Sequence, residues 1–425
     1  MKKNKFDNKQ TRQQPFILLI AELFFIVFSI HITGFDGLFT LRNLAMGVVI
    51  VVAIFFFRRK SMLNINTRRE DLNWVLNSSI FFLYSIALVL INNAPLSDTH
   101  NVLRSTFNFQ IMVVVLPFFL LRMEKRVDRF ALALTIATTI HAIIVLGSFL
   151  SPVFNAYLYA IQAWEDDFLF YRVCGLGIAG AGGSVYLFCG FLANCYYLLF
   201  CRRHVLCFVS LIIIIFSTML VGRTGFYMEV GVMAYSLWRM SNLKTKKTGR
   251  MVTLLSIISS AVIIIAAVGV LERNISVENE KLSYSYNRLD DILEGETLEK
   301  IQSMRVPELN ATTLFFGTGM TKGRSFDGVR IWNDSGYVQR FHGFGLVPAI
   351  ISYLILFIYL WKLLWKIIDK EKRRFLIISI VLMFIIDYKE AFIFYLALPF
   401  VLILFLKLEL YEQKTNQLEV IHRLS

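Results

Sequence analysis

Charged residues are scarce in this chain. Only 17% of its 425 residues are Asp, Glu, Lys or Arg, whereas a soluble globular chain carries about 25%. The hydrophobic share is 56% and the aromatic share is 15%. This composition excludes an ordinary soluble domain and is typical of a protein embedded in a membrane.

Cysteine is also scarce, and its placement argues against two kinds of site. The five cysteines lie in or beside two neighbouring apolar segments: Cys174, Cys189, Cys195, Cys201 and Cys207. None lies in the long polar segment 272–342, where an oxidising compartment would favour a disulfide. There is no Cys-x-x-Cys spacing and no Asp-x-Asp pair that would suggest a divalent-ion site. We therefore expect small apolar filler residues, and neither a metal ion nor another cofactor.

Long apolar runs make up much of the chain. A helix needs roughly 20 apolar residues to cross about 30 Å of hydrocarbon, and unsatisfied backbone groups are costly there, so these runs should be helical. Twelve runs are candidates: 15–32, 43–57, 72–91, 107–121, 130–150, 173–200, 205–221, 226–240, 251–271, 344–365, 375–386 and 391–406. The sequence therefore predicts an all-α polytopic integral membrane protein with about 12 transmembrane helices.

The distribution of lysine and arginine predicts the orientation of these helices. If the N-terminus is cytoplasmic, the inner segments hold 30 of the 44 basic residues, and the short outer segments hold only 5. The remaining 9 lie in segment 272–342, which is too long for the positive-inside rule to apply. Both termini are therefore expected to be cytoplasmic. The first run has no small-residue cleavage pattern before or within it, so we expect it to remain as an anchor.

The net charge of +14 follows from the same distribution. Basic inner loops facing anionic lipid account for the excess, so no nucleic-acid partner is implied. The long outer segment is nearly neutral, with 9 basic and 11 acidic residues, and we expect short amphipathic helices within it. The chain thus divides into spans one to nine (1–271), an extracytoplasmic loop (272–342), and spans ten to twelve with a cytoplasmic tail (343–425).

Two arginines stand out on the predicted outer side. Arg172 opens the glycine-rich stretch YRVCGLGIAGAGG, and Arg223 lies in the turn VGRTG between two apolar runs. One interpretation is that each guanidinium reaches for lipid phosphate at the interface. The other is that both arginines hold a phosphate-bearing ligand, because guanidinium groups bind phosphate oxygens bidentately.

Among the ionisable residues within predicted spans, three are considered as candidates: Glu22, His141 and Glu229. An ionisable group in hydrocarbon costs about 2.5–3.5 kcal/mol on insertion scales, so each is a candidate functional residue. The alternative is a group that is hydrogen-bonded to a neighbouring helix. Glu229 follows Arg223 by six residues, so a salt bridge between them and a role in substrate binding are both open.

The end of the long loop is rich in reactive side chains. Gly317 and Gly319 in TTLFFGTGM permit a tight turn. Four chemistry-bearing residues then precede the apolar run 344–365: Asp334, Tyr337, Arg340 and His342. They place a carboxylate, a phenol, a guanidinium and an imidazole at the membrane surface. The structural alternative is a polar approach to a helix in which Asp334 is the N-cap.

Three separated pieces of the sequence together resemble the Wzy-type oligosaccharide repeat-unit polymerases and the related O-antigen ligases. The first is Arg172 followed by Gly175 at the start of a middle span, and the second is VGRTG, which is similar to the family's Ser-Arg-Thr segment. The third is FFGTGM followed by DSGYVQRFHGFGLVPA. The resemblance covers roughly residues 172–360, and the first five spans match only as hydrophobic segments.

The third piece favours the polymerase branch over the ligase branch. The ligase pattern is His-Asn/Ser, nine residues, then Gly. Ser335 and Gly345 fit this spacing, but Asp334 occupies the histidine position. His342 is nearby at a different spacing, so a catalytic histidine is not carried over to it.

The resemblance implies a GT-C-like glycosyltransferase bundle in the bacterial cytoplasmic membrane, active on its outer side. It implies an undecaprenyl-pyrophosphate-linked oligosaccharide donor and a lipid-linked acceptor, with a chain-length regulator as a partner left open. Arg172 and Arg223 would then bind the pyrophosphate without a metal, and Asp334 would accept the proton of the attacking hydroxyl. The expected substrate-binding residues are Tyr337, Arg340, His342, Glu229, Gly317 and Gly319.

Two other functions are consistent with the sequence. A lipid-linked oligosaccharide flippase or another 12-span transporter would also have both ends inside, but carriers more often show two similar halves and polar residues near the midplane. An O-antigen ligase would share the fold and transfer a finished glycan. A receptor or structural role has less support, since no inner segment suggests a signalling domain.

Overall fold

The computed structural model describes most of the helical part of the chain. It covers residues 14–28, 40–57, 68–96, 100–162, 175–177, 180–201, 205–242, 311–322, 334–391 and 397–424, with the single residues Ile30, Ile32, Asp98, Val173 and Ile393. The predicted ninth span, 251–271, and residues 272–310 and 323–333 of the long loop lie outside the described residues.

Within this part of the chain, helices account for all of the regular structure. They are α1 (Phe16–Phe28), α2 (Leu41–Phe57), α3 (Arg68–Ile91), α4 (Val102–Phe109), the π-helix η2 (Gln110–Val115), α5 (Leu116–Met123), α6 (Val127–Leu150), α7 (Pro152–Gln162), α9 (Ala181–Phe200), α10 (Val205–Val221), α11 (Arg223–Asn242), α15 (Ala311–Phe315), α16 (Gly336–Phe344), α17 (Leu346–Leu364), α18 (Lys370–Asp387) and α19 (Ala397–Leu424). The predicted all-α class is confirmed for these residues.

Five of the helices are long and apolar enough to cross a membrane: Arg69–Ile91, Val102–Met123, Val127–Leu150, Ala181–Phe200 and Leu346–Leu364. Shorter apolar helices lie at Phe16–Phe28, Leu41–Ile54 and Val205–Val221. Each predicted apolar run except 251–271 contains a described helix, and together these helices indicate a membrane-embedded protein. The helices of runs 173–200 and 391–406 begin later than predicted, at Ala181 and Ala397. Helix α7 was not predicted, because its eleven residues are too few to span.

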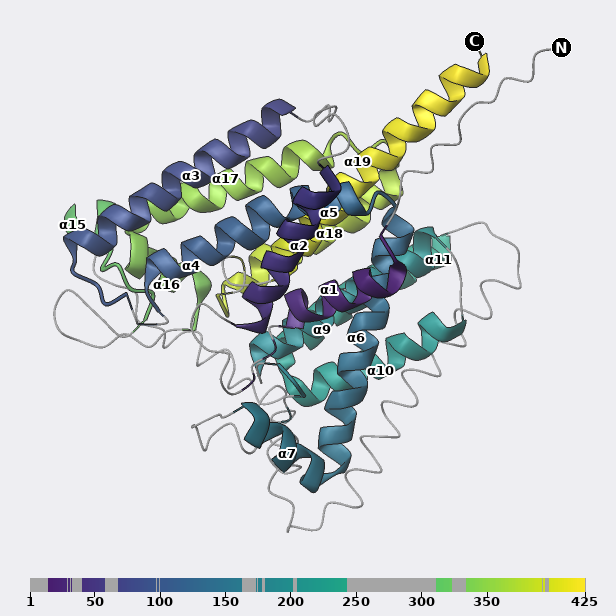
Figure 1. Cartoon of the computed structure of the whole chain (residues 1–425), viewed down its shortest axis with the longest axis horizontal. Helices are drawn as coiled ribbons and strands as arrows, with labels where there is room; N and C mark the ends of the chain where they lie inside the picture. Colours follow the sequence, from purple (N-terminus) through teal and green to yellow (C-terminus); the bar gives the residue numbers. More distant parts are fainter. Residues whose placement is uncertain are drawn as a thin grey trace.

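Helix α9 forms the centre of the bundle. Its spanning window is 83% buried, whereas those of α3 and α17 are only 28% and 33% buried. Small residues let neighbours approach α9 closely: a Cβ on Gly190 would lie 1.9 Å from the Thr138 hydroxyl of α6. Helices α3 and α17 lie side by side at the periphery and expose leucine and isoleucine (Figure 1), as expected of a surface that faces lipid.

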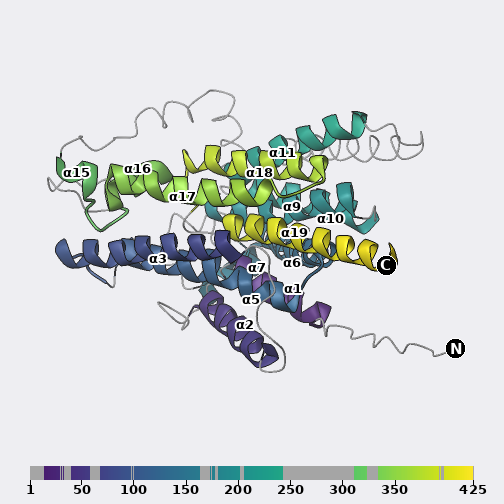
Figure 2. The same cartoon turned by 90° about the horizontal axis from the view of Figure 1, so that it is seen from above.

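Successive long helices run in alternating directions between two ends of the bundle. At one end, which we call the α16 end, the Gly225 amide at the start of α11 donates to Ser184 Oγ at the start of α9 (2.9 Å). At the other, the α19 end, the Val127 amide of α6 donates to Glu412 Oε1 of α19 (2.8 Å). Figure 2 shows α15 and α16 at one end of α17 and the C-terminal part of α19 toward the other.

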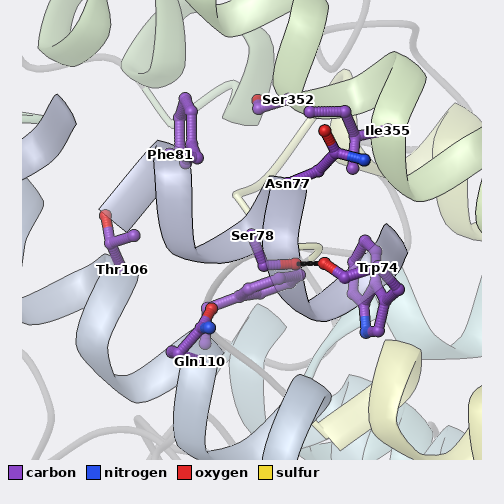
Figure 3. Close-up of a pocket in the computed structure, with 9 residues that line it drawn as sticks. Trp74, Asn77, Ser78, Phe81, Thr106, Gln110, Ser352 and Ile355 are labelled. Carbon is purple, nitrogen blue, oxygen red and sulfur yellow. Dashed lines mark hydrogen bonds between the residues drawn. The ribbon is translucent and has the colours of Figure 1, made fainter. Parts of the chain in front are cut away.

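A small pocket lies between α3, α4–η2 and α17 (Figure 3). Its volume is about 20 Å³, and polar side chains line it together with aromatic and aliphatic ones. The polar residues are Asn77, Ser78, Thr106, Gln110 and Ser352. Gln110 Nε2 donates to Ser79 Oγ (3.3 Å) at the start of the π-helix. A cavity of this size has room for about one water molecule, so it is too small for a sugar or a phosphate group.

A buried ion pair joins three helices toward the α19 end. Lys407 Nζ of α19 and the Tyr359 hydroxyl of α17 both donate to Asp71 Oδ1 of α3, each at 2.9 Å. The Tyr359 ring also stacks on Trp74, with centroids 4.5 Å apart and planes 3° apart. Asp71 and Lys407 are only 7% and 6% exposed, so each charge depends on the other.

Replacing Asp71 with alanine should therefore destabilise the protein strongly. It leaves the Lys407 ammonium buried without its carboxylate, and breaking a buried pair on one side costs about 3–5 kcal/mol. Tyr359→Phe removes one hydrogen bond and should cost about 1 kcal/mol. Unfolding of the detergent-solubilised full-length chain measures both changes. The double variant Asp71→Leu with Lys407→Met should recover most of the loss; equal effects of the two single variants would contradict this account.

Candidate functional site

The turn 316–321 docks along the C-terminal end of α16. Backbone amides of Thr318 and Gly319 donate to the carbonyl oxygens of His342 (2.9 Å) and Gly343 (3.1 Å). A Cβ on Gly317 would lie 2.1 Å from the Gly343 oxygen, and Gly319 has a φ of +76°. Both glycines therefore permit close backbone packing, and the predicted tight turn is present.

The connection between α3 and α4 holds the other side of this turn. Asn92 Nδ2 donates to the Gly317 carbonyl (3.1 Å), and the Val102 amide donates to the Gly319 carbonyl (3.0 Å). The imidazole of His342 is 3% exposed, with Nδ1 at 3.0 Å from the Met320 carbonyl oxygen. The structure thus places His342 inside the turn, where it ties α16 to the incoming chain.

A crevice too narrow to hold a water molecule lies between α16, α17 and the end of α18. It is lined by Thr321, Gly336, Gln339, Arg340, Tyr353, Asp387 and Ala391, and we call it the Arg340 crevice. Arg340 is 2% exposed, and its guanidinium carbon lies 4.8 Å from the centroid of the Phe344 ring. A cation is therefore held at the α16 end in surroundings where its field is screened less than in water.

Asp387 is the acidic member of the crevice, and sequence reasoning missed it. It is 1% exposed and accepts hydrogen bonds from the Tyr353 hydroxyl (2.6 Å) and the Ile393 amide (2.9 Å). Its signal in the sequence was a carboxylate directly after the apolar run FLIISIVLMFII. Only the packing of α16 against α18 shows that it faces Arg340 and Gly336 across the same crevice.

Tyr337 is part of the wall beside this crevice. Its hydroxyl donates to the Phe384 carbonyl (2.8 Å), and its ring lies 4.7 Å from that of Tyr353. Burial, with a smaller contribution from Asp387, raises the pKa of Tyr337 to about 12, so the phenol is neutral at ordinary pH.

Asp334 lies at the surface beside the crevice. Its side chain is 62% exposed, and Oδ1 accepts a hydrogen bond from Lys322 Nζ (2.9 Å). The backbone carbonyl of Asp334 accepts from Gln339 Nε2 (3.1 Å), which links it to the crevice lining. The N-cap interpretation of Asp334 is wrong, because Ser335 occupies the N-cap position of α16.

Arg223 is the first residue of α11, and its backbone position is set by two glycines. Cβ atoms on Gly222 and Gly225 would lie 2.6 Å and 2.1 Å from the carbonyl oxygens of Gly180 and Ser184, so VGRTG packs directly on the start of α9. The side chain of Arg223 lies outside the described part of the chain.

Lys389 links the start of α11 to the crevice. Its Nζ lies 3.5 Å from Thr224 Oγ1, the residue after Arg223, and 5.7 Å from the centroid of the Tyr227 ring. Lys389 follows Asp387 by two residues. The structure therefore brings the VGRTG turn and the end of the long loop to the same end of the bundle.

Arg172 lies outside the described residues, but the glycines that follow it are placed. A Cβ on Gly175 would lie 2.8 Å from Val145 Cγ2 and 3.2 Å from His141 Cε1 of α6. Gly175 also has a φ of +61°, and its carbonyl accepts from Gln162 Nε2 of α7 (2.6 Å). The stretch after Arg172 is thus held between α6 and α7.

The three ionisable residues of the spans are placed away from the Arg340 crevice. Glu229 is 0% exposed and accepts a hydrogen bond from Thr218 Oγ1 of α10 (2.7 Å). The His141 ring stacks on Phe28 of α1 with centroids 4.2 Å apart, and Glu22 of α1 is 5% exposed. For Glu229, the hydrogen bond to a neighbouring helix is the arrangement present.

The described residues contain no cluster of three or more His, Cys, Asp or Glu side chains that could hold a metal ion. What they provide at the α16 end is a mixture of cationic and acidic groups, with a neutral phenol beside them. Such a set can bind an anion and move a proton. No protein-family model matches the chain, and no curated protein is significantly similar to it. The fold and site define an all-α, membrane-embedded protein with a polar crevice at one end of its bundle.

The contact between Gly336 and Asp387 offers a test of the crevice. A Cβ on Gly336 would lie 2.4 Å from Asp387 Oδ2, so Gly336→Ala should push α16 away and cost about 1–3 kcal/mol of stability, as overpacking does. Gly47 of α2 is the matched control, because a Cβ there meets nothing within 4 Å. Thermal unfolding in detergent compares the two; equal stability of both variants would show that α16 does not need this contact.

Proposed function

We propose that this protein is a membrane glycosyltransferase that polymerises lipid-linked oligosaccharide repeat units. The donor would be an undecaprenyl-pyrophosphate glycan and the acceptor a second lipid-linked unit. The reaction would occur on the outer side of the bacterial cytoplasmic membrane, in a GT-C-like bundle of 12 spans with both termini cytoplasmic. The resemblance of three sequence pieces to Wzy-type polymerases motivates the proposal.

The observation that carries the proposal is the gathering of cations at the α16 end. Arg340 is buried in the crevice, and Lys389 connects the crevice to Thr224 at the start of α11. Arg223 directly precedes Thr224, and the stretch after Arg172 reaches the start of α9, on which α11 packs. Pyrophosphate is a good leaving group once its developing charge is met by positioned cations.

The crevice itself is narrow, so the substrate would bind at its mouth. In this arrangement Arg223, Arg172 and Lys389 contact the pyrophosphate oxygens, and the buried Arg340 adds positive potential behind them.

Asp334 fits the role of proton acceptor better than Asp387 does. Asp334 is exposed and tethered by Lys322 through a single oxygen, so the carboxylate can meet a sugar hydroxyl. Both oxygens of Asp387 are occupied, by Tyr353 and by the Ile393 amide. We therefore assign proton transfer to Asp334 and the positioning of α16 against α18 to Asp387.

The alternation of helix ends supports the 12-span arrangement. Helix α11 ends at the α19 end, where Arg239 pairs with Glu371 at the start of α18 (3.6 Å). Helix α15 lies at the α16 end, where its Phe315 carbonyl accepts from Tyr84 of α3 (2.7 Å). Because the end of α11 and helix α15 lie at opposite ends of the bundle, the chain between them must cross it an odd number of times. The proposed span 251–271 would supply one crossing.

A layer of aromatic rings favours an enzyme over a transporter. Four aromatic side chains are at most 2% exposed: Tyr196, Phe130, Phe375 and Phe405. The Tyr196 and Phe405 rings lie 4.7 Å apart, and Phe130 and Phe405 lie 5.1 Å apart. These ring contacts fill the centre of the described bundle toward the α19 end with apolar groups. A carrier would instead place polar residues along its transport path near the midplane.

Deleting the gene and sizing the surface and lipid-linked glycans tests the proposed function. A surface glycan that stops at one repeat unit identifies a polymerase. Long polymer left on the lipid carrier would identify a ligase, and single units trapped inside would identify a flippase. An unchanged ladder in a strain without a second such enzyme would contradict all three.

Complementation with point variants then tests the site. Arg223→Ala and Arg172→Ala should each lower polymerisation by at least about 100-fold, as removing a transition-state donor does. Arg373→Ala, at the start of α18 near the α19 end, is the control at equal expression and should give a normal ladder. Normal glycan length in both test variants would rule out the two-arginine site.

The two aspartates should behave differently. Asp334→Asn should abolish proton acceptance and lower the rate by about 100-fold or more. Asp387→Asn keeps one acceptor oxygen for the Ile393 amide, and its NH2 group can donate to the Tyr353 hydroxyl, so we expect it to lose no more than about tenfold, within the range of a positioning effect. Ladder length at matched expression measures both, and the reverse order would exchange the two roles.

A further inference from the structure

A second polar cavity lies at the α19 end, on the opposite side of the aromatic layer from the Arg340 crevice. We call it the α19-end cavity; its volume is about 500 Å³. Its wall comes from the α5–α6 connection, the end of α9, α18 and the C-terminal part of α19. The lining residues are Lys125, Arg126, Val127, Asp128, Phe200, Cys201, Lys372, Tyr411, Glu412, Thr415 and Asn416.

The floor of this cavity is aromatic and its mouth is polar. Phe200 lies 5.0 Å from Tyr196 and 5.7 Å from Phe375, ring centroid to ring centroid, so the cavity ends on the buried aromatic layer. Thr415 and Asn416 are exposed. The cavity is open on this polar side, so a ligand would enter from the aqueous side of the α19 end.

Two of the three cations in the lining already have acidic partners. Arg126 Nε donates to Asp128 Oδ1 (3.0 Å), and Lys372 Nζ donates to Glu409 Oε1 (2.7 Å). The backbone amide of Lys125 donates to Glu124 Oε1 (3.0 Å), and its side-chain ammonium lies over the Tyr411 ring, with Nζ 5.3 Å from the ring centroid. Lys125 thus brings an ammonium group to the cavity that no described carboxylate neutralises.

We propose that the α19-end cavity binds a phosphate-bearing anion, with Lys125 and Arg126 as its principal contacts. Phosphate oxygens accept from both the ammonium and the guanidinium group. The cavity is many times the roughly 30 Å³ that one water molecule occupies, so it can hold a phosphate ester and its substituent. The ligand is either a soluble phosphate compound or the phosphate head group of an anionic lipid.

Glu412 is the group that opposes such a ligand. Its Oε1 accepts from the Val127 amide (2.8 Å), so it occupies the start of α6 from the α19 side. Burial raises the pKa of Glu412, which shows that its negative charge is poorly solvated there. The charged groups near it are Arg126 and Asp128 from α5–α6, Lys372 from α18, and Glu409 on its own helix. Removing its charge should therefore favour an incoming anion.

Ligand-dependent thermal unfolding of the full-length chain tests the proposal. In detergent, the protein is titrated with sodium phosphate against sodium chloride at matched ionic strength. In a second arm, lipid nanodiscs containing phosphatidylglycerol are compared with nanodiscs of phosphatidylcholine alone. We expect a saturable rise in the unfolding midpoint with phosphate, with phosphatidylglycerol, or with both, since a ligand that binds the folded state stabilises it.

Three variants test which residues of the cavity bind the anion. Lys125→Gln should weaken the apparent affinity at least about fivefold, because it removes a charge-assisted hydrogen bond. Glu412→Gln should strengthen the affinity, since glutamine keeps an acceptor for the Val127 amide without the negative charge. Lys414→Gln changes the same charge as Lys125→Gln on α19 but lies outside the lining, so it should leave the affinity unchanged.

The outcomes distinguish a soluble phosphate ligand, a lipid head group and the absence of a phosphate site. A shift with free phosphate that Lys125→Gln weakens identifies a soluble ligand class. A shift only with phosphatidylglycerol, weakened by the same variant, identifies a lipid head group. Equal shifts in wild type and Lys125→Gln in both arms, or weaker binding in Glu412→Gln, would overturn the proposal. None of these readouts depends on glycosyl transfer, so they are independent of the proposed function.

Discussion

The cost of burying a charge among apolar helices is the constraint on which the rest of this structure depends. Each deeply buried charge at Asp71 and Lys407 is matched by the other, and Tyr359 supplies a further donor. The pair joins α3 to α19, and Tyr359 adds α17 to the contact. Helices α3 and α17 otherwise expose much of their apolar surface, whereas the first half of α19 is buried. An unmatched charge would be lost from such a site, so the pair also fixes which faces of these helices meet.

Two clusters of charged and polar groups lie at the two ends of the bundle. At the α16 end, Arg340 and Asp387 lie in one crevice with Tyr353 between helices α16, α17 and α18. At the α19 end, Lys125, Lys372 and Glu412 surround a larger cavity. Between them lies the aromatic layer around Tyr196 and Phe405. A protein built this way can carry different chemistry at its two ends.

Apolar runs were sufficient to predict most of the helices, because a membrane requires long apolar segments to be helical. Helix α7 escaped prediction because it is too short to span, and its position depends on contacts such as Gln162 with the Gly175 carbonyl. Within the site, the glycines of FFGTGM and the cluster Asp334 to His342 were found from the sequence. Asp387 was not, since a lone carboxylate after an apolar run does not reveal which helix it will face.

The sequence by itself determined the all-α class, the apolar runs and the uneven distribution of basic residues, because these depend on local composition and on the thickness of a bilayer. Only the tertiary structure decided that Asp387 faces Arg340, that Ser335 and not Asp334 caps α16, and that Lys125 lines a cavity with Glu412. Those pairings join residues far apart in the chain. They follow from how helices pack against one another, which small residues and buried charges settle only when all the helices are present together.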